Sequence, residues 1–325
     1  ALAGQAAKAT VEARETEFLD AREQRRIEVM ARFFAVLAAD MQFTADNETM
    51  AVAYVSADNG KDRLKVGQIS SADLAELEHR YQETLVRRNA SQSRARIARA
   101  RLANAMNQPG QLAAELEDPK LEANSRTLPE YEILLPAMLE GNARMRAKLA
   151  LLDASRQRME AVRAENSPVL DAEVEGASWS REAATRDNLR AGVVLSWPLY
   201  QGRRVSAPLA REQAQFHRLQ AEADKLRMDL SDALLEAWSD IDQLQRSVRT
   251  AARKQVEYRD LALEKARGQY EVELKANLGD AMAATMEAKL RERTTEYRLS
   301  LAFARLEALL GGPLNRIFSS GEQAK

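Results

Sequence analysis

The side chains that most often carry catalysis are scarce and scattered in this chain. Cys is absent, which excludes thiolate nucleophiles, zinc–thiolate sites and disulfides. His79 and His217 are isolated and lack the spacing of metal ligands. No phosphate-binding loop, nucleophile motif or paired-carboxylate motif stands out. We therefore expect neither an enzyme nor a site for a cofactor or metal.

One segment is rich in Arg, a side chain that often contacts nucleic acid. It contains Arg87, Arg88, Arg94, Arg96, Arg99 and Arg101. Aromatic residues for base stacking are lacking nearby. The 48 basic and 49 acidic side chains of the chain nearly cancel, so no net field attracts a polyanion. A solvated helix face is the better interpretation, and we expect no nucleic-acid partner.

Long helices dominate the elements that would position any site. Stretches without Gly or Pro run over residues 5–59, 68–108, 142–167, 209–267 and 280–310. In the fourth stretch, apolar residues recur in steps of three and four from Leu219 to Val248, which predicts a single stripe along one helix face. Charged residues are 30% of the chain and aromatic residues 5%. This balance suits long helices that share narrow seams better than a large globular core.

The helical pattern occurs twice. Residues 26–42 match residues 227–243 at a shift of 201, and ADL at 72–74 meets ANL at 276–278 at a shift of 204. Each copy is a very long helix, a short break and a second long helix closed by Pro, which indicates a duplication. Because Val205 maps near the first residues of the chain, we expect the first copy of the segment before it to lie upstream, in a longer protein.

Two segments alternate with the period of β-strands. Over 189–199 the odd positions are Leu, Ala, Val, Leu, Trp and Leu. Over 170–175, apolar residues alternate with Asp171, Glu173 and Glu175. The segment over 189–199 has the length of a tilted membrane-spanning strand. A soluble hairpin that caps a coiled coil would show the same spacing.

The second strand leads into the longest helix through an unusual junction. Aromatic residues at a strand end suit a membrane interface, Pro removes a ladder donor, and Gly allows a sharp change of path. The junction residues are Trp197, Pro198, Leu199, Tyr200 and Gly202.

The order W-P-L-Y-Q-G-R-R at 197–204, followed by a very long helix, resembles the TolC family of bacterial outer-membrane efflux and secretion channels. So does R-L-K-V-G-Q-I-S-S-A-D-L at 63–74, which is similar to the periplasmic tip turn of that family. The resemblance covers essentially the whole chain. It implies a mainly α fold, in which very long antiparallel coiled-coil helices form part of a trimeric α-barrel and a β-hairpin contributes to a transmembrane β-barrel.

The resemblance also implies an organisation and a function. It implies a first helical repeat at 1–118, an equatorial connector at 119–141, a second repeat at 142–313 with strands at about 169–176 and 189–200, and a C-terminal equatorial tail at 314–325. The implied function is the outer-membrane channel of a tripartite efflux pump or type I secretion system in Gram-negative bacteria, with its helices in the periplasm. Its partners would be the other copies of a homotrimer, a periplasmic adaptor, an inner-membrane transporter and outer-membrane lipid. From the residues alone, the rival is a soluble coiled-coil scaffold or tether.

By the same resemblance, an adaptor would dock at the first tip turn. This turn comprises Val66, Gly67, Gln68, Ile69 and Ser70. Ile69 would be an exposed apolar contact for the adaptor. An ordinary turn between helices, with Gly at its C′ position, has the same residues. The second copy departs from the pattern, because Glu273 stands where Gly would be.

The family's gate constriction would fall just beyond the second tip, at Tyr270, Asn277 and Asp280. Asn277 departs from the acidic pattern, so a carboxylate ring would rest on Asp280 of three protomers and would favour cations. Asp280 could equally be a helix N-cap, with Ala281 onward as the first turn. Tyr270 could be a packing residue of its helix.

Overall fold

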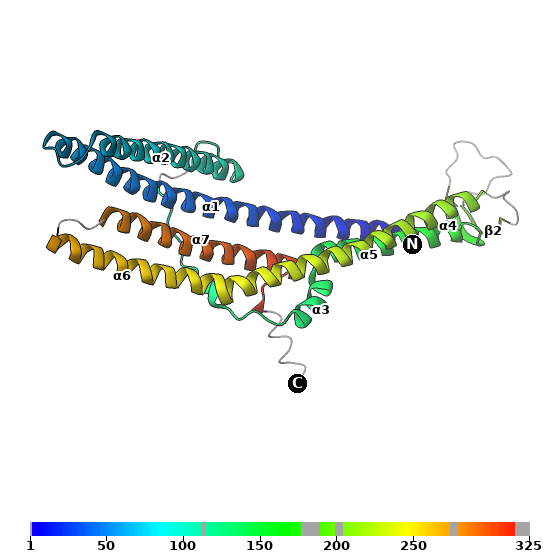
Figure 1. Ribbon diagram of the computed structural model, residues 1–325. Coiled ribbons are helices and arrows are strands. Elements are labelled where there is room, and N and C mark those ends of the chain that lie inside the picture. The colour runs from blue at the N-terminus through cyan, green and yellow to red at the C-terminus, as the bar shows by residue number, and fades with distance from the viewer. Residues whose placement is uncertain (1, 112–114, 177–188, 199–203, 274–277, 316–325) are drawn as a thin grey trace. The chain divides into compact units, whose positions relative to one another are not determined.

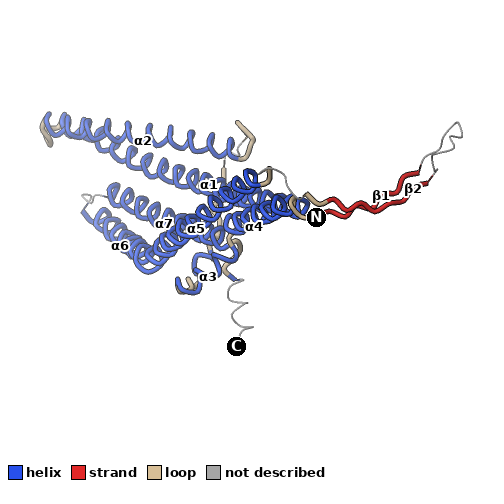
Figure 2. The backbone as a smooth tube through the Cα atoms, turned by 90° about the vertical axis from the view of Figure 1, so that its right-hand side faces the viewer, coloured by secondary structure: helices blue, strands red, loops and turns tan. Residues whose placement is uncertain are grey.

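The computed structural model describes residues 2–111, 115–176, 189–198, 204–273 and 278–315. The helices are α1 (Leu2–Lys65), α2 (Ser71–Ala105), the 3₁₀ turn η1 (Glu122–Ser125), α3 (Tyr131–Gly141), α4 (Ala143–Ala164), α5 (Ser206–Gln243), the π-helical turn η2 (Leu244–Val248), α6 (Arg249–Glu273) and α7 (Leu278–Leu310) (Figure 1). The strands β1 (Val169–Gly176) and β2 (Leu189–Ser196) form one antiparallel hairpin (Figure 2). The expected fold class, mainly α with a β-hairpin, is confirmed.

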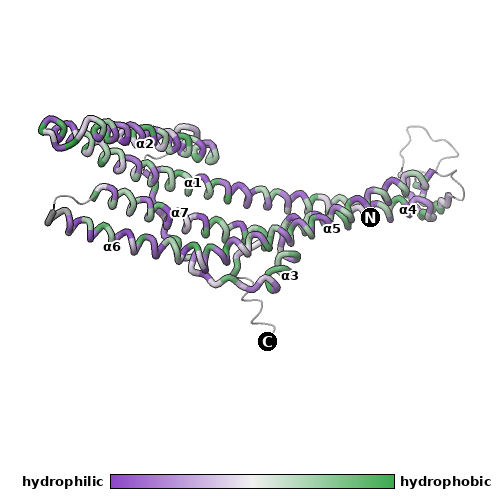
Figure 3. Tube along the Cα trace, viewed as in Figure 1, coloured by the Kyte–Doolittle hydropathy of each residue, from purple (hydrophilic) through white to green (hydrophobic). Residues whose placement is uncertain are grey.

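The predicted stripe, which lies on α5 and η2, is buried in the structure. Leu219, Ala223, Leu230, Ile241 and Leu244 are all buried. Polar and apolar residues interchange along every helix, as the mixed colours in Figure 3 show. This is the pattern of helices that pack along one face and leave the other in water. Among the described helices, none is both long and apolar enough to cross a membrane.

The chain divides into two compact units. The first comprises Ala1–Asp20 and Leu139–Leu230, and the second comprises Ala21–Met138 and Ser231–Lys325. In the first unit, α4 packs beside α5, and Lys148 forms an ion pair with Glu222 across the seam at 3.0 Å. This unit also carries the hairpin.

In the second unit, four helices lie side by side in the order α2, α1, α7, α6 (Figures 1 and 2). Tyr54 of α1 meets Tyr81 of α2, with 5.5 Å between ring centroids. Phe34 of α1 stacks on Tyr297 of α7 at 4.8 Å. Several ion pairs join α6 to α7. Among the described helices of this unit, α2 and α6 therefore occupy the two edges.

A segment between α2 and α3 is held against α7 by buried polar side chains. Asn124, which is 1% exposed, donates hydrogen bonds to the backbone carbonyl and the carboxylate of Glu296, both at 2.8 Å. Arg249 of α6 donates to the same carboxylate at 2.6 Å. Asp118 accepts hydrogen bonds from Arg293 at 2.7 Å and from the Tyr297 hydroxyl at 2.8 Å. We call Asp118, Asn124, Arg249, Glu296 and Tyr297 the connector network.

The π-helical turn η2 takes part in the same attachment. Gln245 in this turn donates its side-chain amide to the carbonyls of Asn124 and Arg126, at 3.1 and 2.9 Å. Near the far end of the segment, Trp238 donates its indole N–H to the carbonyl of Pro129 at 2.9 Å. Side chains thus satisfy the backbone carbonyl of Asn124 in η1 and those of Arg126 and Pro129, which lie outside the helices and strands.

The connector network changes the acidity of its members. Burial alone would raise the pKa of Glu296, but hydrogen bonds from Asn124 and Arg249 outweigh it and lower the pKa of that carboxyl. Burial also opposes ionisation of Asp118, yet the hydrogen bonds from Arg293 and Tyr297 bring its pKa below the ordinary value. Burial and the Asp118 carboxylate together raise the pKa of Tyr297 to about 12. Both carboxyls are therefore ionised at neutral pH, and the phenol is not.

Candidate functional site

The hairpin has one apolar face and one polar face, as the alternation predicts. Its register places Val193 opposite Ala172 and Leu195 opposite Leu170, and residues opposite each other in an antiparallel pair point to the same side. The apolar face comprises Leu170, Ala172, Val174, Leu189, Ala191, Val193 and Leu195. Its large side chains are exposed.

The other face of the hairpin is mainly polar. Glu175 lies opposite Arg190, and Asp171 and Glu173 project to the same side. An isolated two-stranded hairpin is at best marginally stable in water. The exposed apolar face therefore requires an apolar environment or further strands.

At the junction after β2, the structure describes only the first two of the expected residues. Trp197 is exposed and Pro198 is partly buried, and both lie outside the strand. Leu199, Tyr200 and Gly202 lie outside the described residues.

The first tip turn is tightly specified by its backbone. Gly67 has a φ of +74°, in the left-handed region that favours glycine. The N–H of Gly67 donates to the carbonyl of Leu64 at 3.0 Å, and the N–H of Gln68 donates to that of Arg63 at 2.8 Å, which is a Schellman motif. Ser70 then caps α2: its side chain accepts from the N–H of Asp73 at 3.1 Å, and Asp73 accepts in return at 2.8 Å.

The side chains of this turn differ from expectation at one position. Ile69, expected to be an exposed contact, is half-buried. The partial burial of Ile69 is explained by Gly60. Because Gly60 has no side chain, the side-chain ends of Ile69, Leu74 and Leu77 come together over it. Val66 is the exposed apolar residue of the turn, with 68% of its surface accessible.

At the second tip, the structure pairs Asp280 with a residue that the sequence did not suggest. The Arg80 guanidinium of α2 donates to the Asp280 carboxylate at 2.6 Å. α7 already begins at Leu278, so Asp280 lies in its first turn rather than at the N-cap position. Asn277 lies outside the described residues, and Tyr270 belongs to α6, although its side chain is not described.

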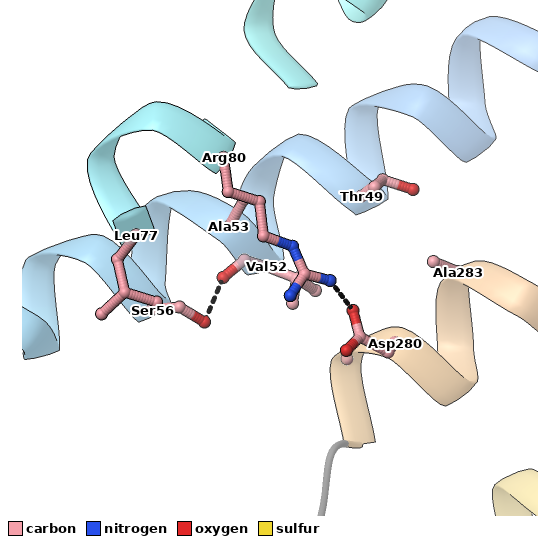
Figure 4. A pocket seen from close by; sticks show the side chains of 9 residues that line it. Thr49, Val52, Ala53, Ser56, Leu77, Arg80, Asp280 and Ala283 are labelled. Atoms are coloured by element: carbon pink, nitrogen blue, oxygen red, sulfur yellow. Dashed lines mark hydrogen bonds and ion pairs between the residues drawn. The ribbon is translucent and has the colours of Figure 1, made fainter. Parts of the chain in front are cut away.

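The ion pair crosses over α1. In Figure 4, Arg80 extends past Val52 and Ala53 of α1 toward Asp280. The pair borders a cavity of about 170 Å³ between α1, α2 and α7. The two side chains are 57% and 36% exposed, so water reaches the pair and weakens it. It joins the outer helix α2 directly to the start of α7.

Gly279 is what allows α7 to begin so close to α1. A Cβ atom at this position would lie 2.2 Å from a methyl carbon of Val52. No side chain fits in that space without movement of one helix.

Gly279→Ala should therefore separate the first turn of α7 from α1 and lower the free energy of unfolding by about 1–3 kcal/mol. Gly268→Ala is the matched control, because Gly268 is exposed in α6 and has open space around its Cα. That change should be neutral or stabilise by up to about 1 kcal/mol. Thermal unfolding of both purified variants measures the difference. Equal midpoints would show that the contact with Val52 is unimportant.

Sequence reasoning missed the partners in these contacts. Arg80 looked like an ordinary helix residue, and neither Asn124 nor Arg249 belongs to a motif. Arg80 and Asp280 are separated by 200 residues, and no local pattern connects them. In the part of the chain that the structure describes, no group of three or more His, Asp or Glu residues could hold a metal ion.

Comparison with known proteins defines the class to which this fold and these sites belong. A family model described as outer membrane efflux protein matches residues 134–312, more than half of the chain. The chain belongs to the outer membrane efflux protein family. No curated protein matches the sequence.

Solved structures of outer-membrane channels share the fold. The outer membrane protein VceC of Vibrio cholerae has a TM-score of 0.70 at 16% identity, over 95% of this chain and 75% of that one. The outer-membrane channel OprN gives 0.73 at 20% identity, over 95% and 70%. The CmeC channel of Campylobacter jejuni gives 0.71 at 12% identity, over 99% and 70%. The resemblance to TolC-like channels is confirmed.

Proposed function

We propose that the protein is the outer-membrane channel of a tripartite efflux pump or type I secretion system. It acts as a passive conduit across the periplasm and the outer membrane. Membership of the outer membrane efflux protein family supports this, as does a fold shared with OprN and CmeC, whose structures are described as outer-membrane channels.

The two-faced hairpin is the observation that carries the proposal. Its apolar face suits lipid, and its face with Asp171, Glu173 and Glu175 suits a water-filled lumen. A strand edge cannot stay unpaired in lipid, so the hairpin must join strands of other copies. The hairpins of a homotrimer would supply six strands, fewer than the eight of the smallest outer-membrane barrels, so further strands would have to join them to enclose the lumen. A soluble scaffold would leave the apolar face in water.

The helical tips would meet the rest of the pump. An adaptor in the periplasm would dock at the first tip turn, where Val66 offers an exposed apolar contact. The adaptor would connect the channel to a transporter of the inner membrane. The gate would lie at the second tip, where the Arg80–Asp280 ion pair holds the start of α7 against α2.

Single-cysteine labelling tests the membrane assignment. The chain has no native Cys, so each introduced thiol reports alone. Cysteines at Arg190 and Ser196 should react with a water-soluble maleimide in outer-membrane vesicles. Cysteines at Val193 and Leu195, on the opposite face, should stay protected until the protein is unfolded. Labelling at 193 and 195 with protection at 190 and 196 would refute the proposal.

A further inference from the structure

A groove of about 600 Å³ lies between α1 and α2. Its apolar lining consists of Ala31, Ala35 and Ala39 on α1 and of Ile97 and Ala98 on α2. Ile97, the largest of these side chains, is 50% exposed, so the groove is open to solvent. The volume lies within the range of small-molecule sites, which are mostly apolar with a few charged or polar groups.

The groove is also basic. Arg94 and Arg101 lie three residues before and four residues after Ile97, so all three share one face of α2. Both arginines line the groove and are exposed, and their guanidinium groups make no hydrogen bond or ion pair with any described residue. From residue 84 to residue 105, α2 contains six Arg and no Asp or Glu. No acidic neighbour on this helix therefore neutralises them.

The acidic residues of α1 beside the groove already have cations. Glu28, which lines the groove, accepts hydrogen bonds from Arg25 and from Arg32, both at 2.6 Å. Asp40, which follows the last lining alanine, pairs with Arg99 at 2.5 Å. The unpaired positive charge of the groove is therefore left on the lining arginines of α2.

We propose that this groove binds an organic acid with a straight apolar chain, such as the anion of a fatty acid. Its carboxylate binds the Arg101 guanidinium, whose fork can donate two parallel hydrogen bonds. Its chain lies along Ile97 and the alanines. The Arg101 end is favoured because Arg25 and Arg32 outnumber Glu28 there. The inference goes beyond the proposed function and does not depend on it, since every residue involved lies on α1 or α2 of one chain.

The dimensions of the groove favour a chain over a larger partner. Its lining on α1 extends over residues 28–39, which is about 16 Å at 1.5 Å per residue. Neighbouring helix axes are about 8–10 Å apart, so the groove is longer than it is wide. A stable protein–protein interface uses about 20–30 residues a side, whereas nine residues line this groove. A small, elongated ligand therefore fits better than a partner helix.

Protection of a thiol tests the site. The chain has no native Cys, and Ala35 is exposed in the groove, so Ala35→Cys places a single reporter there. Millimolar decanoate should slow the reaction of this thiol with a water-soluble maleimide about fivefold, in the full-length protein in membranes. Ala90→Cys is the matched control, because Ala90 is exposed on α2 and does not line the groove. Its rate should change less than twofold.

Three other compounds define the chemistry that the groove selects. Acetate has the carboxylate without the chain, decyltrimethylammonium has the chain with the opposite charge, and cholate has the carboxylate on a rigid ring system. None should protect position 35 at the concentration at which decanoate gives half of its full effect. Equal protection by any of the three, or equal slowing at position 90, would overturn the proposal.

Arg101→Gln tests the anchor of the carboxylate. In the Ala35→Cys protein, this change should raise the decanoate concentration for half-protection at least tenfold. Arg87→Gln should leave it unchanged, because Arg87 is exposed on the same helix outside the groove. Each variant is compared with its own rate without decanoate, since loss of a cation also alters thiolate reactivity.

Two results with these variants would contradict the proposal. Half-protection at the same decanoate concentration with and without Arg101 would show that this guanidinium does not hold the ligand. A thiol at position 35 that fails to react even without decanoate would show that another part of the assembled protein fills the groove. Either result would overturn the binding site and leave the channel function standing.

Discussion

Replacing Arg249 with Ala should destabilise the second unit by about 3 kcal/mol. The substitution removes a guanidinium 2.6 Å from the Glu296 carboxylate, which is only 7% exposed. Asn124 at 2.8 Å and the more exposed Arg253 at 3.4 Å would remain beside this buried carboxylate, so we expect the lower end of the range of about 3–5 kcal/mol for loss of one partner of a buried pair. The midpoint of thermal unfolding of the purified protein measures the loss.

Arg246→Ala is the control for this prediction. Arg246 lies one turn before Arg249 and also pairs with an acidic residue, Asp242, but its side chain is 78% exposed. Exposed pairs contribute little, so this change should cost less than about 1 kcal/mol. If both variants unfolded at the same temperature, the connector network would not stabilise the unit as described.

The Arg249–Glu296 contribution should also depend on pH. The fold lowers the pKa of Glu296 below its ordinary value of 4.5. A carboxyl with a lowered pKa contributes its stability in full above the ordinary value, and loses it as pH falls through the lowered one. The difference in stability between wild type and Arg249→Ala should therefore narrow in acid.

Removing either side of the Arg80–Asp280 ion pair should favour the open channel. A partly exposed pair contributes about 0.5 kcal/mol, so three protomers opening together would lose about 1.5 kcal/mol. This corresponds to roughly a tenfold shift in the equilibrium between closed and open states. Single-channel recordings should show equal increases in open probability for Arg80→Ala and Asp280→Ala, and no further increase in the double variant.

Two further results complete this test. Lys65→Ala removes an exposed ion pair with Asp62 inside α1, also close to a tip, and should leave the open probability unchanged. The carboxylate ring expected from the sequence predicts a different pair of results for Asp280→Ala and Arg80→Ala. In that case Asp280→Ala alone would relieve block by multivalent cations, and Arg80→Ala would have no effect.

The elements of the fold were predictable because their signals are local. The helical stripe from Leu219 onward and the alternation over 189–196 arise from residues within two turns or two strand positions of one another. The hairpin register follows from the same alternation, since a slip by one residue would mix its two faces.

The side-chain contacts of the sites were not predictable in the same way. Arg80 reaches Asp280, and Asn124 reaches Glu296, across long stretches of chain whose approach depends on how whole helices pack. The partial burial of Ile69 depends on Gly60, a residue in the preceding helix that belongs to no motif. Sequence patterns locate a turn or a face, but tertiary packing decides which neighbour a side chain meets.

The central claim is that copies of this chain enclose a water-filled path through a membrane. The most direct measurement is the electrical conductance of a planar lipid bilayer to which the purified, unmodified protein has been added. We predict discrete current steps of uniform size, each marking the insertion of one trimer. A bilayer that stays at its baseline conductance, while the inserted protein is demonstrably present, would contradict the claim.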